Sequence, residues 1–581
     1  MRALGSFRAP VAPCLGLLLV LLTASLDRPA PLGAAQVSSP DPAGDASADQ
    51  GTVEDLLRNR LEAARAAAAP RVQGRALLAR NALQTVYLER DYRPLWTSAA
   101  GGPSPAADSL LAVVAGADRH GLEPADYGLP LLREVAARVR AEPSDLSARV
   151  DLELLLSDAF LVYGSHLLLG RVDPVRIEAE WLANRRSADL PGALSRALGG
   201  GGIRGVLEGE LAPGQPEYAR LQVALATLLR ARAAGGWPGL GSGAALREGD
   251  VDPRVAALRE RLALSTDPGE RAAAAEGRDE PEWFDPALDR AVRSFQERHG
   301  LEADGVVGAG TVAAMDVPVE ARIRQVQINM ERWRWLPAEL GRRHIRVNIA
   351  AFETEVWDGG RLAMHLRSIV GRQYRMSPSF TGSMRYLVLA PYWHVPPRIA
   401  AVDKLPEIQR DPGYLARQRF TLLDAATNQP VDPGTVDWAA VSGPSFNAHY
   451  RLRQDPGPLN ALGNVKFMFP NRHSVYLHDT PQRELFARTR RDFSSGCIRI
   501  ENPMELARFL LSDDPSWTPE RIRQVVDGGV ERTVNLPEPV PVHLLYLTAY
   551  VEADGRVHFR TDLYGRDAIV LTALDSDPPG S

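Results

Sequence analysis

The spacing of apolar residues changes along this chain of 581 residues, and the change falls near His344. From residue 53 to residue 247, apolar side chains recur at steps of three and four, which is typical of helices buried on one face. After His344 the period becomes two, because Ile345, Val347 and Ile349 alternate with other residues as in a half-buried strand. A chain of this length with both patterns must divide into separate cores, so we predict a multidomain protein.

Two helical regions come before the change. Residues 53–247 are predicted to form an α-helical scaffold domain, broken into separate helices by Gly and Pro clusters such as Gly199 to Gly202. Residues 252–316 are predicted to form a small helical domain, with Phe295 and Leu301 in its core and glycine turns between its helices. Neither region carries an arrangement of residues that we interpret as catalytic.

The strand-like region, residues 322–515, is predicted to be a mainly β domain that begins with a connecting helix. A stretch rich in Pro, Asp and Gly interrupts it at residues 395–455. A loop of that length inside a β domain is usually functional or a small subdomain. We therefore predict a capping subdomain inserted over the site.

The end of the chain is predicted to complete the β domain. Asn502 and Pro503 are typical of a helix start, with the Asn side chain as cap and Pro in the first turn. Residues 516–570 are expected to supply closing strands, including a hairpin of residues 542–550 and 557–563. Residues 571–581 are expected to be a disordered tail.

The first residues have the pattern of an export signal: two arginines, a short apolar run from Cys14 to Ala24, and small residues at Gly33 to Ala35. Residues 1–35 are predicted to be a signal peptide or a retained N-terminal anchor, which would be the protein's only membrane contact. Residues 36–52 are predicted to be a flexible linker. The net charge of -5 gives no basic field, so we expect no nucleic-acid partner.

The candidate site is His478 together with Cys497, nineteen residues later. Removal of the signal peptide would leave Cys497 as the only cysteine, either an inert buried residue or a reactive thiol. The scattered histidines show no metal-ligand spacing, so we expect neither a metal nor another cofactor. A serine triad is also unsupported, because no Gly-x-Ser-x-Gly elbow follows a strand.

A cysteine enzyme must favour the thiolate, because a free thiol with a pKa of about 8.5 is mostly protonated near neutrality. His478 is the candidate base, and arginines such as Arg499 would make the surroundings electropositive. Gly496 allows a tight turn or close approach of substrate, and the N–H groups of Gly496 and Cys497 are candidates to stabilise an oxyanion.

Three neighbouring side chains are candidates for substrate contact. Ser494 and Ser495 either add hydrogen bonds or shape the turn. Tyr476, two residues before His478 on an alternating strand, would point to the same face as the histidine.

These residues match a known signature. His478-Asp479 and Ser494-Ser495-Gly496-Cys497-Ile498-Arg499 resemble the signature of the L,D-transpeptidase (YkuD-type) catalytic domain. The segments Glu331 to Pro337, Ala390 to Pro397 and Phe559-Arg560 resemble the large multidomain YcbB-like branch. Residues 252–316 resemble the three-helix peptidoglycan-binding module of that branch. Two positions depart from the pattern. Ser495 stands where many members have His, and His394 stands where the related motif has Asn.

The resemblance implies a periplasmic cysteine acyltransferase that makes 3→3 peptidoglycan cross-links through a thioester and releases the terminal D-alanine of a donor stem. Arg499 and Arg372 would bind stem carboxylates, and Trp393 would contact substrate. Peptidoglycan stem peptides are the implied partners, with other wall-synthesis enzymes as further ones.

Two alternatives stay open at this point. The same thioester would serve an L,D-carboxypeptidase, a D-amino-acid exchange enzyme or a lipoprotein attachment enzyme. A non-catalytic wall-binding protein is the alternative from another class, and covalent capture of Cys497 by a carbapenem would exclude it.

Overall fold

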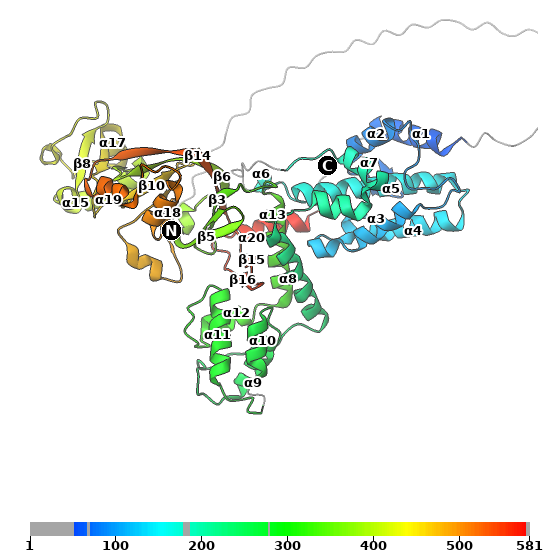
Figure 1. The fold of residues 1–581 in the computed structure, drawn as a ribbon, viewed down its shortest axis with the longest axis horizontal. Helices are drawn as coiled ribbons and strands as arrows, with labels where there is room; N and C mark the ends of the chain where they lie inside the picture. The colour runs from blue at the N-terminus through cyan, green and yellow to red at the C-terminus, as the bar shows by residue number, and fades with distance from the viewer. Residues whose placement is uncertain (1–50, 67–69, 178–185, 277–278, 577–581) are drawn as a thin grey trace, which may run out of the picture. The chain divides into compact units, whose positions relative to one another are not determined.

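The computed structural model describes residues 51–66, 70–177, 186–276 and 279–576 (Figure 1). The predicted signal peptide at 1–35 lies outside the described residues, and so does the predicted linker at 36–52, except for Gly51 and Thr52.

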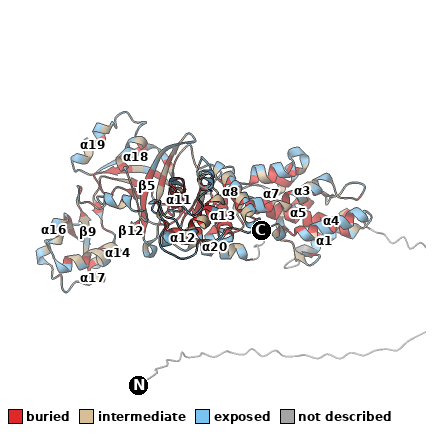
Figure 2. Ribbon diagram, turned by 90° about the horizontal axis from the view of Figure 1, so that it is seen from below, coloured by how far each residue is buried: buried red, intermediate tan, exposed pale blue. Residues whose placement is uncertain are grey.

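The scaffold domain packs its helices around α5, whose residues are buried on almost every side (Figure 2). Among the described helices, α5 alone has the length and hydropathy of a membrane span, and 89% of its apolar window is buried inside the protein. It is therefore the core helix of this domain. The helices of this core are α1 (Val53–Ala66), α2 (Arg80–Leu88), α3 (Pro105–Ala115), α4 (Leu129–Ala141), α5 (Leu146–Leu169) and α7 (Leu190–Arg196). The next long helix, α8 (Pro216–Ala233), packs in a different core.

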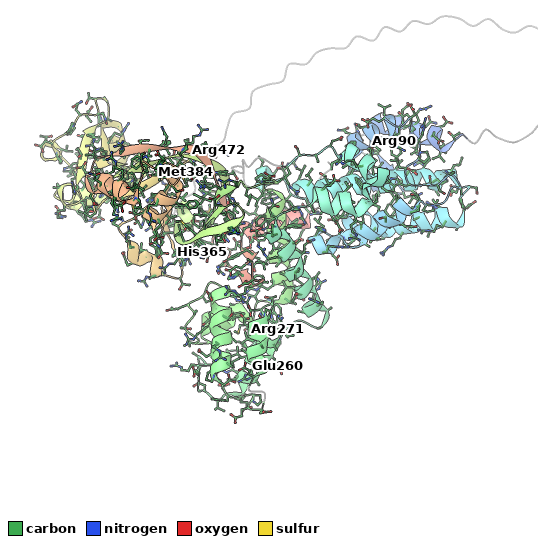
Figure 3. The ribbon with its side chains drawn as sticks, in the orientation of Figure 1. Arg90, Glu260, Arg271, His365, Met384 and Arg472 are labelled. Atoms are coloured by element: carbon green, nitrogen blue, oxygen red, sulfur yellow. The ribbon has the colours of Figure 1, made fainter. Side chains whose placement is uncertain are left out.

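The small domain has a separate apolar core that includes Phe295 and Leu288. Glu260 and Arg271, which lie on two of its helices, are marked in Figure 3. The described residues form four helices here, one more than the three-helix module that the sequence resembles: α9 (Pro253–Ala263), α10 (Pro268–Ala275), α11 (Pro286–Arg298) and α12 (Ala309–Met315). The connecting helix α13 (Val319–Arg334) then leads into the β domain.

The β domain is built on a nine-stranded sheet in the order β12-β5-β13-β11-β10-β6-β14-β3-β4, and β4 also pairs with β5. The long strand β5 thus closes the sheet on itself, and Met384 of β6 is fully buried in the core (Figure 3). The strands are β3 (Arg343–Asn348), β4 (Glu353–Asp358), β5 (Arg361–Gly371), β6 (Phe380–Leu389), β10 (Val465–Met468), β11 (Leu477–His478), β12 (Asp492–Ser494), β13 (Ile498–Ile500) and β14 (Arg532–Leu545).

The segment predicted as a capping insertion, residues 395–455, folds with its flanks around an apolar core that is separate from the main sheet. We call this unit the cap. Its three-stranded sheet has the order β7-β9-β8. The cap contains β7 (Trp393–His394), α14 (Pro397–Ile399), η6 (Ala400–Lys404), α15 (Leu405–Arg410), α16 (Tyr414–Arg417), β8 (Phe420–Asp424), α17 (Gly443–His449) and β9 (Tyr450–Gln454).

Helix α18 (Pro503–Leu510) begins where the sequence predicts, but its cap differs. Asn502 adopts the left-handed conformation, with φ of 50°, and its side chain makes no capping hydrogen bond. The predicted side-chain cap is wrong because the usual N-cap hydrogen bond needs an extended residue at this position.

The predicted hairpin of residues 542–550 and 557–563 is shorter than expected. β14 ends at Leu545, and a separate hairpin pairs β15 (Ala549–Val551) with β16 (Val557–Phe559). The side-chain oxygens of Asn348 and Asn329 accept the N–H groups of Leu547 and Thr548, each over 3.0 Å, and these bonds replace strand pairing there. Only β14 therefore completes the main sheet, and residues 516–570 also include the helix α19 (Pro519–Asp527).

The expected tail is partly helical. Helix α20 (Arg566–Asp575) includes residues 571–575, so the prediction of disorder is wrong for them, and residues 577–581 lie outside the described part of the chain. Arg171 of the scaffold domain donates to the Ala573, Leu574 and Ser576 carbonyls and holds the end of α20. The predicted fold class, a helical scaffold, a small helical domain and a mainly β domain with a cap, is confirmed.

Candidate active site

Cys497 lies in a tight turn between β12 and β13. Gly496 has φ of 114°, a conformation that side chains disfavour, so this position requires glycine. The buried Ser494 hydroxyl donates to the Cys497 carbonyl over 2.6 Å and accepts the Gly496 N–H over 3.1 Å. Ser494 therefore shapes the turn, which was one of the two roles that the sequence left open.

The predicted oxyanion donors are only partly available in this geometry. The Gly496 N–H donates to the Ser494 hydroxyl inside the turn and is therefore engaged in this geometry. Among the described residues, nothing accepts a hydrogen bond from the Cys497 N–H. That N–H group is the remaining backbone candidate.

The register of two parallel strands brings the candidate residues together. β11 pairs with β13 so that Leu477 lies opposite Ile498 and His478 opposite Arg499. Leu477 and Ile498 are fully buried in the core. Because side chains alternate along a strand, their neighbours face the other side. There Tyr476, His478, Cys497 and Arg499 line one cavity of about 1040 Å³.

The other predicted contact residues line the same cavity. Arg372, Trp393, Ser494 and Ser495 are all in its wall. Of the residues predicted from the sequence, only Gly496 is not exposed to the cavity, and it forms the turn behind Cys497.

His478 is held as a neutral base. Its Nδ1 lies 2.5 Å from the Asp479 carbonyl, which can only accept, so the ring proton is on Nδ1 and Nε2 carries the lone pair. Burial, and after it the Arg499 guanidinium, lower the pKa of His478 to about 3. The imidazole is therefore uncharged at neutral pH and can take a proton at Nε2.

Cys497 is a protonated thiol in this setting. Burial raises its pKa to about 11, although a backbone hydrogen bond from Tyr476 and the charge of Arg499 both favour the anion. Arg499 favours the thiolate, as the sequence predicts, whereas burial disfavours it and has the larger effect on the thiol pKa. The Cys497 thiol donates to the Ser474 carbonyl over 3.9 Å, and it shares the cavity with the neutral imidazole of His478.

The arginines near Cys497 have different positions. Arg499 donates from Nη1 to the Gln482 side chain over 2.8 Å, and its buried Nε has no partner among the described residues. Arg372 donates to the Tyr374 hydroxyl over 3.0 Å. Arg490 pairs with Asp492 and Arg491 with backbone carbonyls, so these two hold the local fold.

The cap supplies residues that the sequence did not single out. Asp403 of η6 accepts two hydrogen bonds from Arg375, which also donates to the Ser495 hydroxyl over 2.9 Å. The Lys404 ammonium lies 5.6 Å from the ring centre of Trp393 and, like Asp403 and Arg375, lines the cavity. No local pattern marks these residues, because distant segments of the chain bring them to the cavity that Cys497 lines.

Tyr476 links the two cores around the site. Its ring packs against the core of the main sheet and against that of the cap, 5.6 Å from the His478 ring. Burial raises the pKa of its phenol, so the hydroxyl stays protonated and can donate. No group of three or more His, Cys, Asp or Glu residues that could hold a metal occurs in the described part of the chain.

A family model described as the L,D-transpeptidase catalytic domain matches residues 342–526, which contain this site. This region is an L,D-transpeptidase catalytic domain of the YkuD family. A model described as "Putative peptidoglycan binding domain" matches residues 252–315, and one described as a scaffold domain matches residues 81–225. The L,D-transpeptidase domain is therefore the third part of a multidomain chain, as the sequence predicted.

Parts of this chain are also similar to two named proteins and to one solved structure. A protein of Haemophilus influenzae named "Putative L,D-transpeptidase" is 35% identical over 249 residues, 43% of this chain and 49% of that one, so the chain spans about half of its length. Epoxide hydrolase 1 of Sus scrofa is 27% identical over 100 residues, 17% of this chain and 22% of that one. The solved L,D-transpeptidase of Xylanimonas cellulosilytica is 14% identical, with 52% of this chain and 99% of that one covered and a TM-score of 0.17.

Proposed function

We propose that this protein cross-links peptidoglycan stem peptides in the 3→3 manner, through a thioester on Cys497. One observation carries the proposal: Cys497, in the turn before β13, and His478, on β11, line one large cavity that is rich in cations. Asp403 is the only carboxylate among the described residues that line it, and Arg375 neutralises that charge. The cavity therefore suits a ligand with several carboxylates, such as a stem peptide. The lining cations are Arg372, Arg375, Arg398, Lys404 and Arg499.

The first half-reaction forms the thioester. Cys497 Sγ attacks the carbonyl carbon of the third stem residue, a diamino acid, while His478 Nε2 takes the thiol proton. The Cys497 N–H and the Tyr476 hydroxyl are the proposed donors to the oxyanion. The bond to the terminal D-alanine then breaks, and His478 returns the proton to the leaving amine.

The second half-reaction transfers the acyl group. The side-chain amine of a second stem attacks the thioester carbonyl, His478 takes a proton from that amine, and the sulfur leaves and regains the proton as a thiol. Water competes with the amine at this stage. The cap walls one side of the cavity and would limit this competition. A substrate of this kind implies a cell-envelope, periplasmic location and, as further partners, other wall-synthesis enzymes.

The test uses purified wall fragments that contain tetrapeptide stems. Mass spectrometry of fragments incubated with the wild type should show cross-linked dimers that have lost one D-alanine, and Cys497→Ala should give neither dimer nor thioester. Trimmed tripeptides alone would contradict transfer and favour hydrolysis. Failure of a carbapenem to add mass at a free Cys497 in folded protein would contradict the enzyme itself.

A further inference from the structure

Behind the nucleophile turn lies Ser377, a fully buried residue between β5 and β6 that does not line the cavity. Its hydroxyl donates to the Gly496 carbonyl over 2.8 Å and accepts the Gly371 N–H over 3.0 Å. Both hydrogen-bonding directions of the hydroxyl are thus used. The side chain is fixed between the loop that carries it and the peptide bond before Cys497.

Fixing the Gly496 carbonyl also fixes the Cys497 N–H. The two groups belong to one planar trans peptide unit, in which the C=O and the N–H point in opposite directions. The carbonyl points at Ser377 on the buried side. The Cys497 N–H must therefore point away from the buried side, and it has no acceptor in the part of the chain that the structure describes.

The loop around Ser377 is itself held from the C-terminal segment. The Tyr564 hydroxyl accepts the Ser377 N–H over 3.3 Å and donates to the Gly371 carbonyl over 2.5 Å. Arg566 donates to the Ser377 carbonyl over 2.9 Å. A methyl group on Gly371 would lie 2.1 Å from the Arg375 carbonyl, so the backbone is packed too closely here for any side chain at this position.

We propose that Ser377 is a positioning residue that aims the Cys497 N–H at the oxyanion of the acyl-transfer reaction. The inference rests on the proposed function, because only acyl transfer develops such an oxyanion. Ser377 touches neither substrate nor Sγ in this arrangement, and it acts through the Gly496–Cys497 peptide. Without its hydroxyl this peptide can rotate, and the N–H loses its fixed direction.

The test compares acylation with alkylation of the same sulfur. Acylation of Cys497 by a carbapenem passes through an oxyanion, whereas displacement on iodoacetamide forms none. Removal of one well-placed oxyanion donor costs about 100-fold to 1000-fold. Because Ser377→Ala loosens the donor without removing it, we expect acylation to slow by about 10-fold to 100-fold, with alkylation within twofold of the wild type.

Ser379→Ala is the matched control. Ser379 is buried on the same loop, but its hydroxyl accepts from Arg566 and does not reach Gly496. Ser379→Ala should leave the rates of acylation and of alkylation within about threefold of the wild-type rates. Equal acylation by wild type and Ser377→Ala, or a parallel fall in acylation and alkylation, would overturn the positioning role. If the wild type is acylated by the carbapenem but releases no D-alanine from stem peptides, the proposed function fails, while the acylation ratio still decides the role of Ser377.

Discussion

Arg375 donates to both carboxylate oxygens of Asp403, over 2.5 and 2.9 Å, and so joins the catalytic domain to the cap. The Arg375 side chain is 8% exposed and that of Asp403 is 36% exposed. The hydrogen bond between the two raises the pKa of Arg375 and lowers that of Asp403, so both stay charged. Since Arg375 also reaches Ser495, one side chain connects the cap with the nucleophile turn.

Asp403→Asn should loosen the cap. The pair is partly exposed, and its loss should cost about 1 kcal/mol, which is about a fivefold change in the ratio of closed to open cap. We expect faster hydrogen exchange in α15 and more hydrolysis per transfer. Asp411→Asn is the control, because its pair with Arg417 also lies in the cap but is exposed. Equal rates of hydrogen exchange in Asp403→Asn and Asp411→Asn would show that the pair of Arg375 with Asp403 does not hold the cap.

The thiol should react as a protonated cysteine. With a pKa of about 11 for Cys497, the thiolate fraction is small near neutrality and rises about tenfold per pH unit. Alkylation by iodoacetamide, followed by intact mass, should therefore rise with this slope between about pH 7 and pH 10. A rate that is constant from pH 6 to pH 8 would instead indicate a preformed thiolate–imidazolium pair.

The residues that could be predicted from the sequence are those with a local signal. Ile345, Val347 and Ile349 alternate, and they occupy β3 because one face of that strand is buried. Tyr476 and His478 are two residues apart, and the strand places them on the same face. Local spacing was sufficient for these residues, because the period of a strand fixes the direction of each side chain.

The residues that were missed depend on contacts between distant segments. Ser377 contacts the nucleophile turn directly, through its hydrogen bond to the Gly496 carbonyl. Asp403 is connected to the turn through Arg375. In both cases about a hundred residues of sequence separate the segments that meet. The thiol pKa cannot be predicted from the sequence for a related reason: neighbouring arginines are visible in the sequence, whereas burial of Cys497 is a property of the fold. The direction of the Gly496 N–H likewise follows from its bond to Ser494 and not from residue type.

The neutral His478 should extend the reaction to acid pH. The base is available above its pKa of about 3 and is lost only as the pH falls through that value. The unfolded histidine takes up a proton near pH 6.5, so the free energy of unfolding should fall as the pH drops below about 6.5. We expect the rate of carbapenem acylation not to fall between pH 7 and pH 5, because His478 stays unprotonated in this range. A half-maximal rate near pH 6.5 in folded protein would contradict this.

Arg298 and Glu270 should hold the small helical domain in place. Their side chains are 2% and 0% exposed, and Arg298 also donates to the Val557 carbonyl of the C-terminal hairpin. Glu270→Ala leaves a buried guanidinium without its counter-charge, which costs about 3–5 kcal/mol. We expect a lower melting temperature and faster hydrogen exchange in α10 and α11.

Glu276→Ala is the control for this prediction. It removes the exposed pair with Arg290 and should change the free energy of unfolding by less than about 0.5 kcal/mol. Equal effects of the two substitutions would show that the buried network does not stabilise this domain.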